Sequence, residues 1–139
     1  FDNPLLSDFK KVIDELKDPI DSTFIAEFQK STLTRPIKDE MLQLFINESI
    51  KVPAHVWKGV SDGWKKNDYL TTLQSFDKPA LIIWGDKDLY SPKEDQLLLN
   101  KTMRNSQLLI NEGTGHANQW EEPERFAKNL VQFINSSVK

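Results

Sequence analysis

The feature that most constrains this chain is a short apolar run, Ala80–Trp84, which Pro79 precedes and Gly85 follows. A run of this length that is apolar at consecutive positions predicts a strand buried on both faces. Strands of this kind are typical of parallel sheets, because helices cover both faces of such a sheet. The run therefore predicts an α/β fold in which short parallel strands are flanked by helices.

An acidic turn and then a helix are expected after this run. The turn carries two acids, Asp86 and Asp88. The stretch Ser-Pro-Lys-Glu at 91–94 has the composition of a helix start, with Ser91 as N-cap and Glu94 completing a capping box. We expect three apolar residues to form the buried side of this helix: Leu97, Leu98 and Met103.

A second short strand is expected at residues 107–110, and the glycine turn 113–115 leads from it to His116. A final helix is expected from Glu122-Pro123 onward, because apolar residues then recur at helical spacing: Phe126, Leu130, Phe133 and Ile134. The acidic pair Glu121 and Glu122 suits the N-terminus of that helix.

The acids and His116 each follow the C-terminal end of an expected strand, where ligands bind in open α/β sheets. An Asp that faces a His fixes the imidazole tautomer and stabilises the imidazolium, which is how a general base is built. Two plainer interpretations stay open on spacing alone. Asp88 could be a turn residue that caps the next helix, and His116 could be a surface residue of a glycine loop.

Two stretches, PALIIWGDKDLYSP and NEGTGHANQWEEPERFAKNLVQFI, resemble the C-terminal end of an α/β-hydrolase. In that family an acid follows the seventh strand in a Gly-x-x-Asp pattern, and a His follows the eighth strand in a Gly-His loop. The resemblance implies that Asp88, three places after Gly85, is the catalytic acid and that His116 is the catalytic base. Asp86 is the competing acid. The resemblance implies no metal and no organic cofactor.

The resemblance also implies a nucleophile upstream of the acid, on a Gly-x-Ser-x-Gly elbow. We do not expect the glycine pairs Gly59/Gly63 and Gly113/Gly115 to frame it, and no Cys can replace it. The chain is therefore expected to be the C-terminal portion of a serine-type hydrolase of ester-like small molecules, inactive alone. Its expected partners are the substrate and either the missing N-terminal half or a second copy of itself. The alternatives are an Asp nucleophile, as in epoxide hydrolases and dehalogenases of this fold, or a non-enzymatic helical interaction module.

The residues before the acid strand predict one helix after another, interrupted at Asp18-Pro19, Arg35-Pro36 and Val52-Pro53. Asp21 is expected to cap the second helix, and a fifth helix is expected from Asp68. This region resembles the helical cap of many α/β-hydrolases. We place the cap at residues 1–67 and the hydrolase core at 68–139. Trp57 and Trp64 are expected to pack in the cap rather than to line a pocket, and close packing against a neighbouring helix is expected at Gly59 and Gly63.

Composition excludes several other classes of protein. The net charge is −3 and no basic stripe stands out, which argues against a nucleic-acid partner. No apolar run approaches the ~20 residues that a membrane span requires. The absence of Cys excludes disulfides and thiolate metal sites, and it favours a cytoplasmic protein.

Overall fold

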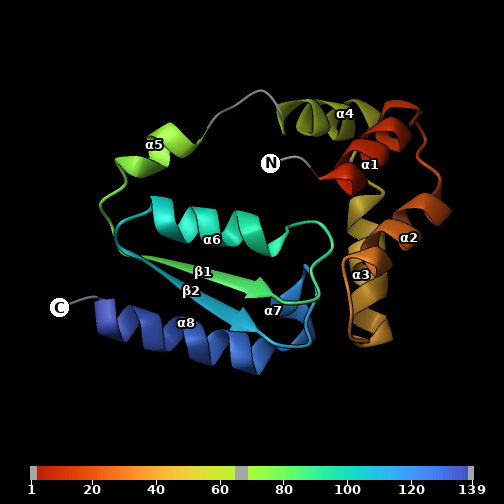
Figure 1. Ribbon diagram of the computed structural model, residues 1–139. Coiled ribbons are helices and arrows are strands. Elements are labelled where there is room, and N and C mark those ends of the chain that lie inside the picture. The colour runs from red at the N-terminus through yellow and green to blue at the C-terminus, as the bar shows by residue number, and fades with distance from the viewer. Residues whose placement is uncertain (1–2, 65–68, 138–139) are drawn as a thin grey trace. The chain divides into compact units, whose positions relative to one another are not determined.

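The computed structural model describes residues 3–64 and 69–137 of the chain (Figure 1). The chain divides into two compact units. Residues Phe1–Thr32 and Ile37–Asp68 form the first, and Leu33–Pro36 with Tyr69–Lys139 form the second. The predicted boundary at residues 67 and 68 and the predicted helix start at Asp68 lie outside the described residues.

The first unit consists of helices joined by short connections: α1 (Pro4–Asp14), α2 (Ser22–Ser31), α3 (Asp39–Ser49) and α4 (Ala54–Gly63). The cap predicted at Asp21 is confirmed, because its side chain accepts a hydrogen bond from the amide of Thr23 at 2.6 Å. Asn3 caps α1 in the same way, through the amide of Leu5. These side chains satisfy amides that the first turn of a helix leaves unpaired.

Aromatic packing organises the interior of the helical unit. Trp57 meets the rings of Phe24 and Phe28 edge-on, with centroids 5.7 and 5.1 Å apart. Phe9 stacks on Phe28 and, at 6.3 Å, on Trp64. Trp57 therefore packs in this unit as predicted, whereas Trp64 keeps 41% of its surface exposed. The smaller apolar residues buried in this unit are Ile13, Ile20, Ile25 and Ala54.

The second unit is built on the predicted parallel strand pair, β1 (Ala80–Gly85) and β2 (Ser106–Asn111), paired in register from Ala80 with Ser106 to Gly85 with Asn111. Helix α6 (Lys93–Thr102) connects the strands and packs on both of them. In Figure 1, α6 and the final helix α8 (Pro123–Ser137) lie on opposite sides of the pair. Two short helices complete the unit, α5 (Leu70–Gln74) and α7 (Asn118–Glu121). The sequence did not predict α7.

The prediction that the first strand is buried on both faces was wrong. Only Trp84 and Gly85 are buried, and the rest of β1 is half-buried. Leu97 and Leu98, predicted to lie on the buried side of α6, are 48% and 40% exposed. The sheet has only two strands among the described residues, so neither side chains of further strands nor their helices cover these positions.

The predicted start of α6 was also wrong. Pro92, not Ser91, is the N-cap residue, and no side chain caps the helix. The backbone of Ser91 is engaged by the turn before it. Its amide donates to Asp88 Oδ1 at 3.2 Å, and its carbonyl accepts from Trp84 Nε1 at 2.7 Å. These bonds fix Ser91 as part of the acid turn, so the helix begins at Lys93.

No helix among residues 3–64 and 69–137 is both long enough and apolar enough to cross a bilayer.

Gly85 ends β1 where two loops come together. A Cβ atom added at Gly85 would lie 2.3 Å from the carbonyl oxygen of Gly115 and 2.4 Å from that of Thr114. These are backbone atoms, which cannot move away as the end of a flexible side chain can. Gly59 and Gly63 in α4 differ, since an added Cβ meets no atom within 4 Å at either position. The close helix packing expected at these two glycines was therefore wrong.

We expect Gly85→Ala to lower the free energy of unfolding by about 2 kcal/mol or more, because an added methyl in this contact forces the backbone apart. Gly59→Ala is the matched control, with open space for the methyl inside a helix, and it should raise stability by up to ~1 kcal/mol. Urea unfolding followed by circular dichroism measures both changes. Equal effects at the two glycines would contradict the close approach at Gly85.

Candidate active site

Asp88 and His116 meet at the carboxyl end of the strand pair. Gly85 and Asn111 are register partners at the ends of β1 and β2, so the loops that follow them begin side by side. Asp88 lies three residues into the first loop, and His116 lies five residues into the second. Their side chains touch, with His116 Nδ1 at 2.9 Å from Asp88 Oδ2.

The two oxygens of the Asp88 carboxylate have different partners. Oδ1 accepts hydrogen bonds from the amides of Tyr90 at 2.8 Å and of Ser91 at 3.2 Å, while Oδ2 faces the imidazole. The Asp88 side chain is 5% exposed, and that of His116 is 47% exposed. The acid is thus held rigidly inside the protein. The histidine is engaged through Nδ1 and keeps an accessible ring.

The contact shifts both groups toward their charged forms. Burial alone raises the pKa of Asp88. The hydrogen bond and charge of His116, with the amides of Tyr90 and Ser91, outweigh burial and hold this pKa below its ordinary value. The hydrogen bond from Asp88 raises the pKa of His116, burial opposes it, and the charge of Asp88 adds to the rise. A histidine stabilised as imidazolium is a stronger base toward a proton donor.

Asp86, the competing acid, lies in the same turn but does not contact His116. Its Oδ1 accepts a hydrogen bond from the amide of Gly113 at 2.5 Å. Two backbone bonds run beside this contact, from Asp86 N to the Asn111 carbonyl at 3.2 Å and from Lys87 N to the Thr114 carbonyl at 2.9 Å. Asp86 therefore joins the acid turn to the histidine loop.

Side chains that the sequence analysis did not single out surround this pair. The ring of Tyr90 meets that of His116 edge-on, with centroids 5.3 Å apart. Beneath the histidine loop, the buried Asn111 donates through Nδ2 to Asn118 Oδ1 at 3.3 Å, and Thr114 Oγ1 donates to the Asn111 carbonyl. Polar groups this well buried need such partners, and together they hold the loop that carries His116.

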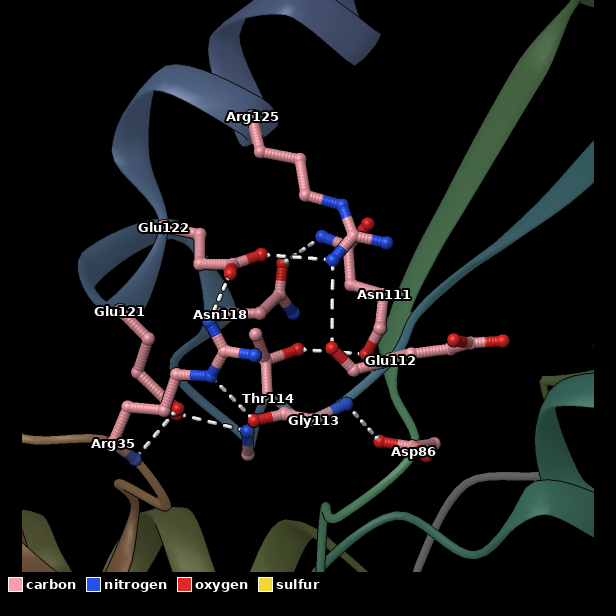
Figure 2. Close-up of polar contacts among 11 residues, drawn as sticks. Arg35, Asp86, Asn111, Glu112, Gly113, Thr114, Asn118, Glu121, Glu122 and Arg125 are labelled. Atoms are coloured by element: carbon pink, nitrogen blue, oxygen red, sulfur yellow. Dashed lines mark hydrogen bonds and ion pairs between the residues drawn. The ribbon is translucent and has the colours of Figure 1, made fainter.

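Glu121 and Glu122 do not serve the N-terminus of α8 as predicted. The Glu121 carboxylate binds the backbone amides of Thr34, Arg35 and Gly115. Glu122 forms ion pairs with Arg35 and with Arg125 (Figure 2). No spacing rule connects Arg35 with acids 86 and 87 positions later, so the sequence carried no signal for this cluster.

One serine does stand between glycines at the elbow spacing, a point that the sequence argument overlooked. Gly59-Val60-Ser61-Asp62-Gly63 has the form Gly-x-Ser-x-Gly. It lies inside α4 rather than between a strand and a helix, as a nucleophile elbow must. Ser61 is 1% exposed, and its hydroxyl donates to the Lys58 carbonyl at 2.9 Å. Ser61 is therefore a core residue of the helical unit.

A comparison of the chain with known families agrees with this arrangement, in which an acid follows one parallel strand and a histidine follows the other. Residues 9–123 match the family described as the alpha/beta hydrolase fold. The chain belongs to the α/β-hydrolase family. The predicted fold class, the C-terminal part of an α/β-hydrolase with short parallel strands flanked by helices, is confirmed.

Proteins similar to this chain are named as hydrolases, lipases and esterases. A 2-hydroxy-6-oxononadienedioate/2-hydroxy-6-oxononatrienedioate hydrolase of Burkholderia vietnamiensis is 26% identical over 95% of this chain and 42% of its own length. Monoacylglycerol lipase ABHD6 of Bos taurus is 29% identical over 91% of the chain and 43% of its own length. An esterase of Exiguobacterium antarcticum has the same fold, with a TM-score of 0.81 at 20% identity, covering 95% of this chain and 48% of the esterase. Most of the chain aligns with these curated relatives, but it spans less than half of their length.

We expect the stability that Asp88→Asn removes to depend on pH. The raised pKa of His116 means that the contribution of the pair is complete below about pH 6.5 and disappears as pH rises through the raised value. The lowered pKa of Asp88 means that the contribution is present above about pH 3.8 and disappears as pH falls through the lowered value. The amide of Asn can still accept from Tyr90 N and Ser91 N, so the substitution removes mainly the charge.

Urea unfolding of wild type and Asp88→Asn from pH 3 to pH 9 measures this difference. It should be greatest between the two ordinary pKa values and smaller at both extremes. A difference that is constant across the range would contradict a charged Asp88–His116 pair.

Proposed function

We propose that this chain supplies the acid and the base of a serine-type α/β-hydrolase that acts on an ester-like small molecule. The observation that carries the proposal is the 2.9 Å contact between His116 Nδ1 and Asp88 Oδ2 at the carboxyl end of the strand pair. Membership of the α/β-hydrolase family and relatives that are named as hydrolases and a lipase support the reaction class.

In the proposed reaction a serine hydroxyl, supplied from outside these 139 residues, attacks the carbonyl carbon of the substrate. His116 Nε2 takes the proton of that hydroxyl and then gives it to the leaving alcohol as the acyl-enzyme forms. Water then attacks the acyl-enzyme, again losing a proton to Nε2, which returns the proton to the serine oxygen. Asp88 stays ionised throughout, keeps the proton of Nδ1 directed toward itself and stabilises the imidazolium.

We also propose that the helical unit, residues 1–67, is the cap that selects the substrate. Its surface supports this role, since several apolar side chains stay exposed after the unit has packed its own interior: Val56 at 39%, Val60 at 58% and Trp64 at 41%. A small, partly apolar substrate suits such a surface.

We expect Asp88→Asn, placed in the longer enzyme that contains the serine, to lower kcat for a generic ester by about four orders of magnitude, as the loss of a triad acid does elsewhere. Asp86→Asn is the matched control. It removes a charge from the same turn and weakens the bond to Gly113, so its effect should be much smaller. Steady-state kinetics with p-nitrophenyl esters measures both changes in kcat. A larger loss from Asp86→Asn would show that Asp88 is not the catalytic acid.

The 139-residue chain leaves much of its second unit open. Among the described residues, each of β1 and β2 has the other as its only strand partner. Apolar side chains stay exposed on the helices beside them: Leu97 and Leu98 on α6, and Leu130, Val131 and Ile134 on α8. Unpaired strand edges next to exposed apolar surface favour association. We propose that the chain alone has no esterase activity and pairs with the N-terminal half of such an enzyme or with a second copy of itself.

Sedimentation of the purified chain, combined with an esterase assay, checks this proposal. We expect a dimer or larger species at micromolar concentration and no turnover above buffer. A stable monomer would contradict the association, and turnover that His116→Ala abolishes would contradict the inactivity.

A further inference from the structure

The carboxylate of Glu121 collects backbone amides from two distant parts of the chain. Its Oε1 accepts from Gly115 N at 2.8 Å and from Thr34 N at 3.3 Å, and its Oε2 accepts from Arg35 N at 2.9 Å. Gly115 directly precedes His116 and is buried. A carboxylate suits this position because its two oxygens can accept several bonds, and bonds to an ionised acceptor are stronger than neutral ones.

The fit around Gly115 leaves no room for a side chain. An added Cβ there would lie 2.8 Å from Glu121 Oε1 and 2.8 Å from Thr34 Oγ1. The carboxylate, the peptide before His116 and the segment Leu33–Pro36 are therefore in direct contact. Because the contact is so close, a change at Glu121 displaces the backbone that carries the imidazole of His116.

A second set of contacts fixes the other end of the same loop. Arg35 Nε donates to the Gly113 carbonyl at 2.8 Å, and its guanidinium pairs with Glu122. Glu122 in turn accepts from Arg125 Nη1 at 2.8 Å. Figure 2 shows Arg35 between the acids of residues 121–122 and the loop at Gly113. The loop that leads to His116 is thus held at Gly113 by Arg35 and at Gly115 by Glu121.

We propose that Glu121 is a positioning residue for His116. By holding the amide of Gly115 it fixes the backbone at the histidine, and so keeps Nδ1 within hydrogen-bonding distance of Asp88. The inference rests on the proposed function, in which His116 is the base. Proton transfer depends on the placement of the base to within a fraction of an ångström, which is why such support matters.

The same carboxylate holds the amides of Thr34 and Arg35, in the segment that connects α2 to α3. The chain leaves the helical unit after Thr32 and returns to it at Ile37, so this segment belongs to the unit that carries His116. Glu121 therefore binds the histidine loop and the connection between two helices through one functional group.

The test is the pKa of His116 in the 139-residue chain, followed by NMR of the imidazole. The chain has only two histidines, so His55→Gln identifies the signals of His116. Glu121→Asp keeps the charge but shortens the side chain, so that it cannot reach all three amides. We expect this substitution to lower the pKa of His116 by about half a unit or more, because the bond to Asp88 that raises it is weakened.

The same substitution in an Asp88→Asn background separates positioning from other effects. If Glu121 acts through the Asp88–His116 contact, Glu121→Asp changes the His116 pKa little once Asp88 has lost its charge. An equal fall in both backgrounds, or no fall in either, would overturn the proposal. Glu124→Asp is the matched control on the exposed side of the first turn of α8, and we expect it to leave the His116 pKa unchanged.

Gly115→Ala disturbs the same contact from the other side and provides a second variant if Glu121→Asp does not fold. It should lower the pKa of His116 in the wild-type background and not in Asp88→Asn. None of these measurements uses turnover. If the longer enzyme stays active without His116, the proposed function is contradicted. The pKa measurements would still test the positioning role of Glu121 independently.

Discussion

The close approach of the Gly85 backbone to the Thr114–Gly115 peptide is the constraint on which the rest of the site depends. The parallel register puts Gly85 opposite Asn111, and the absence of a side chain at Gly85 lets the histidine loop fold directly onto the acid turn. The bonds from Lys87 N to Thr114 O and from Gly113 N to Asp86 then follow. A larger residue at Gly85 would force the two loops apart, and we expect this to weaken the contact between Asp88 and His116.

The two acids of the turn have different partners. Asp86 directs its carboxylate to the backbone of the neighbouring loop, and Asp88 directs one oxygen to its own turn and the other to the imidazole. A carboxylate with both oxygens occupied in this way has little freedom to rotate. In the proposed function, Asp88 is oriented in advance toward a histidine that gains positive charge, and such preorganisation is a large part of electrostatic catalysis.

Outside this pair, polar groups rather than apolar packing hold the histidine loop. Asn111 and Thr114 are fully buried and bonded beneath it. Glu121 binds it from the end of α7, and Arg35 binds it from the segment between α2 and α3. Buried polar networks of this kind specify one arrangement strongly, because each member loses much when a partner moves. The loop can therefore be glycine-rich and still hold its histidine in place.

The sequence by itself determined the order of elements apart from α7, the parallel strands and the pair of residues that meet at their ends. It could do so because a short apolar run, a glycine turn and helical periodicity are local signals, and the family pattern Gly-x-x-Asp with Gly-His spans few residues. Only the tertiary structure decided which residues hold that pair. Ser91 was predicted to cap α6 but is bound into the acid turn, and Glu121 was predicted to serve α8 but binds Gly115, Thr34 and Arg35. The contacts of Ser91 are local, but its backbone rather than its side chain makes them, and the packing of the turn decides this. Glu121 binds amides of a distant segment that folding brings close, and no spacing in the sequence indicates that those amides will be there.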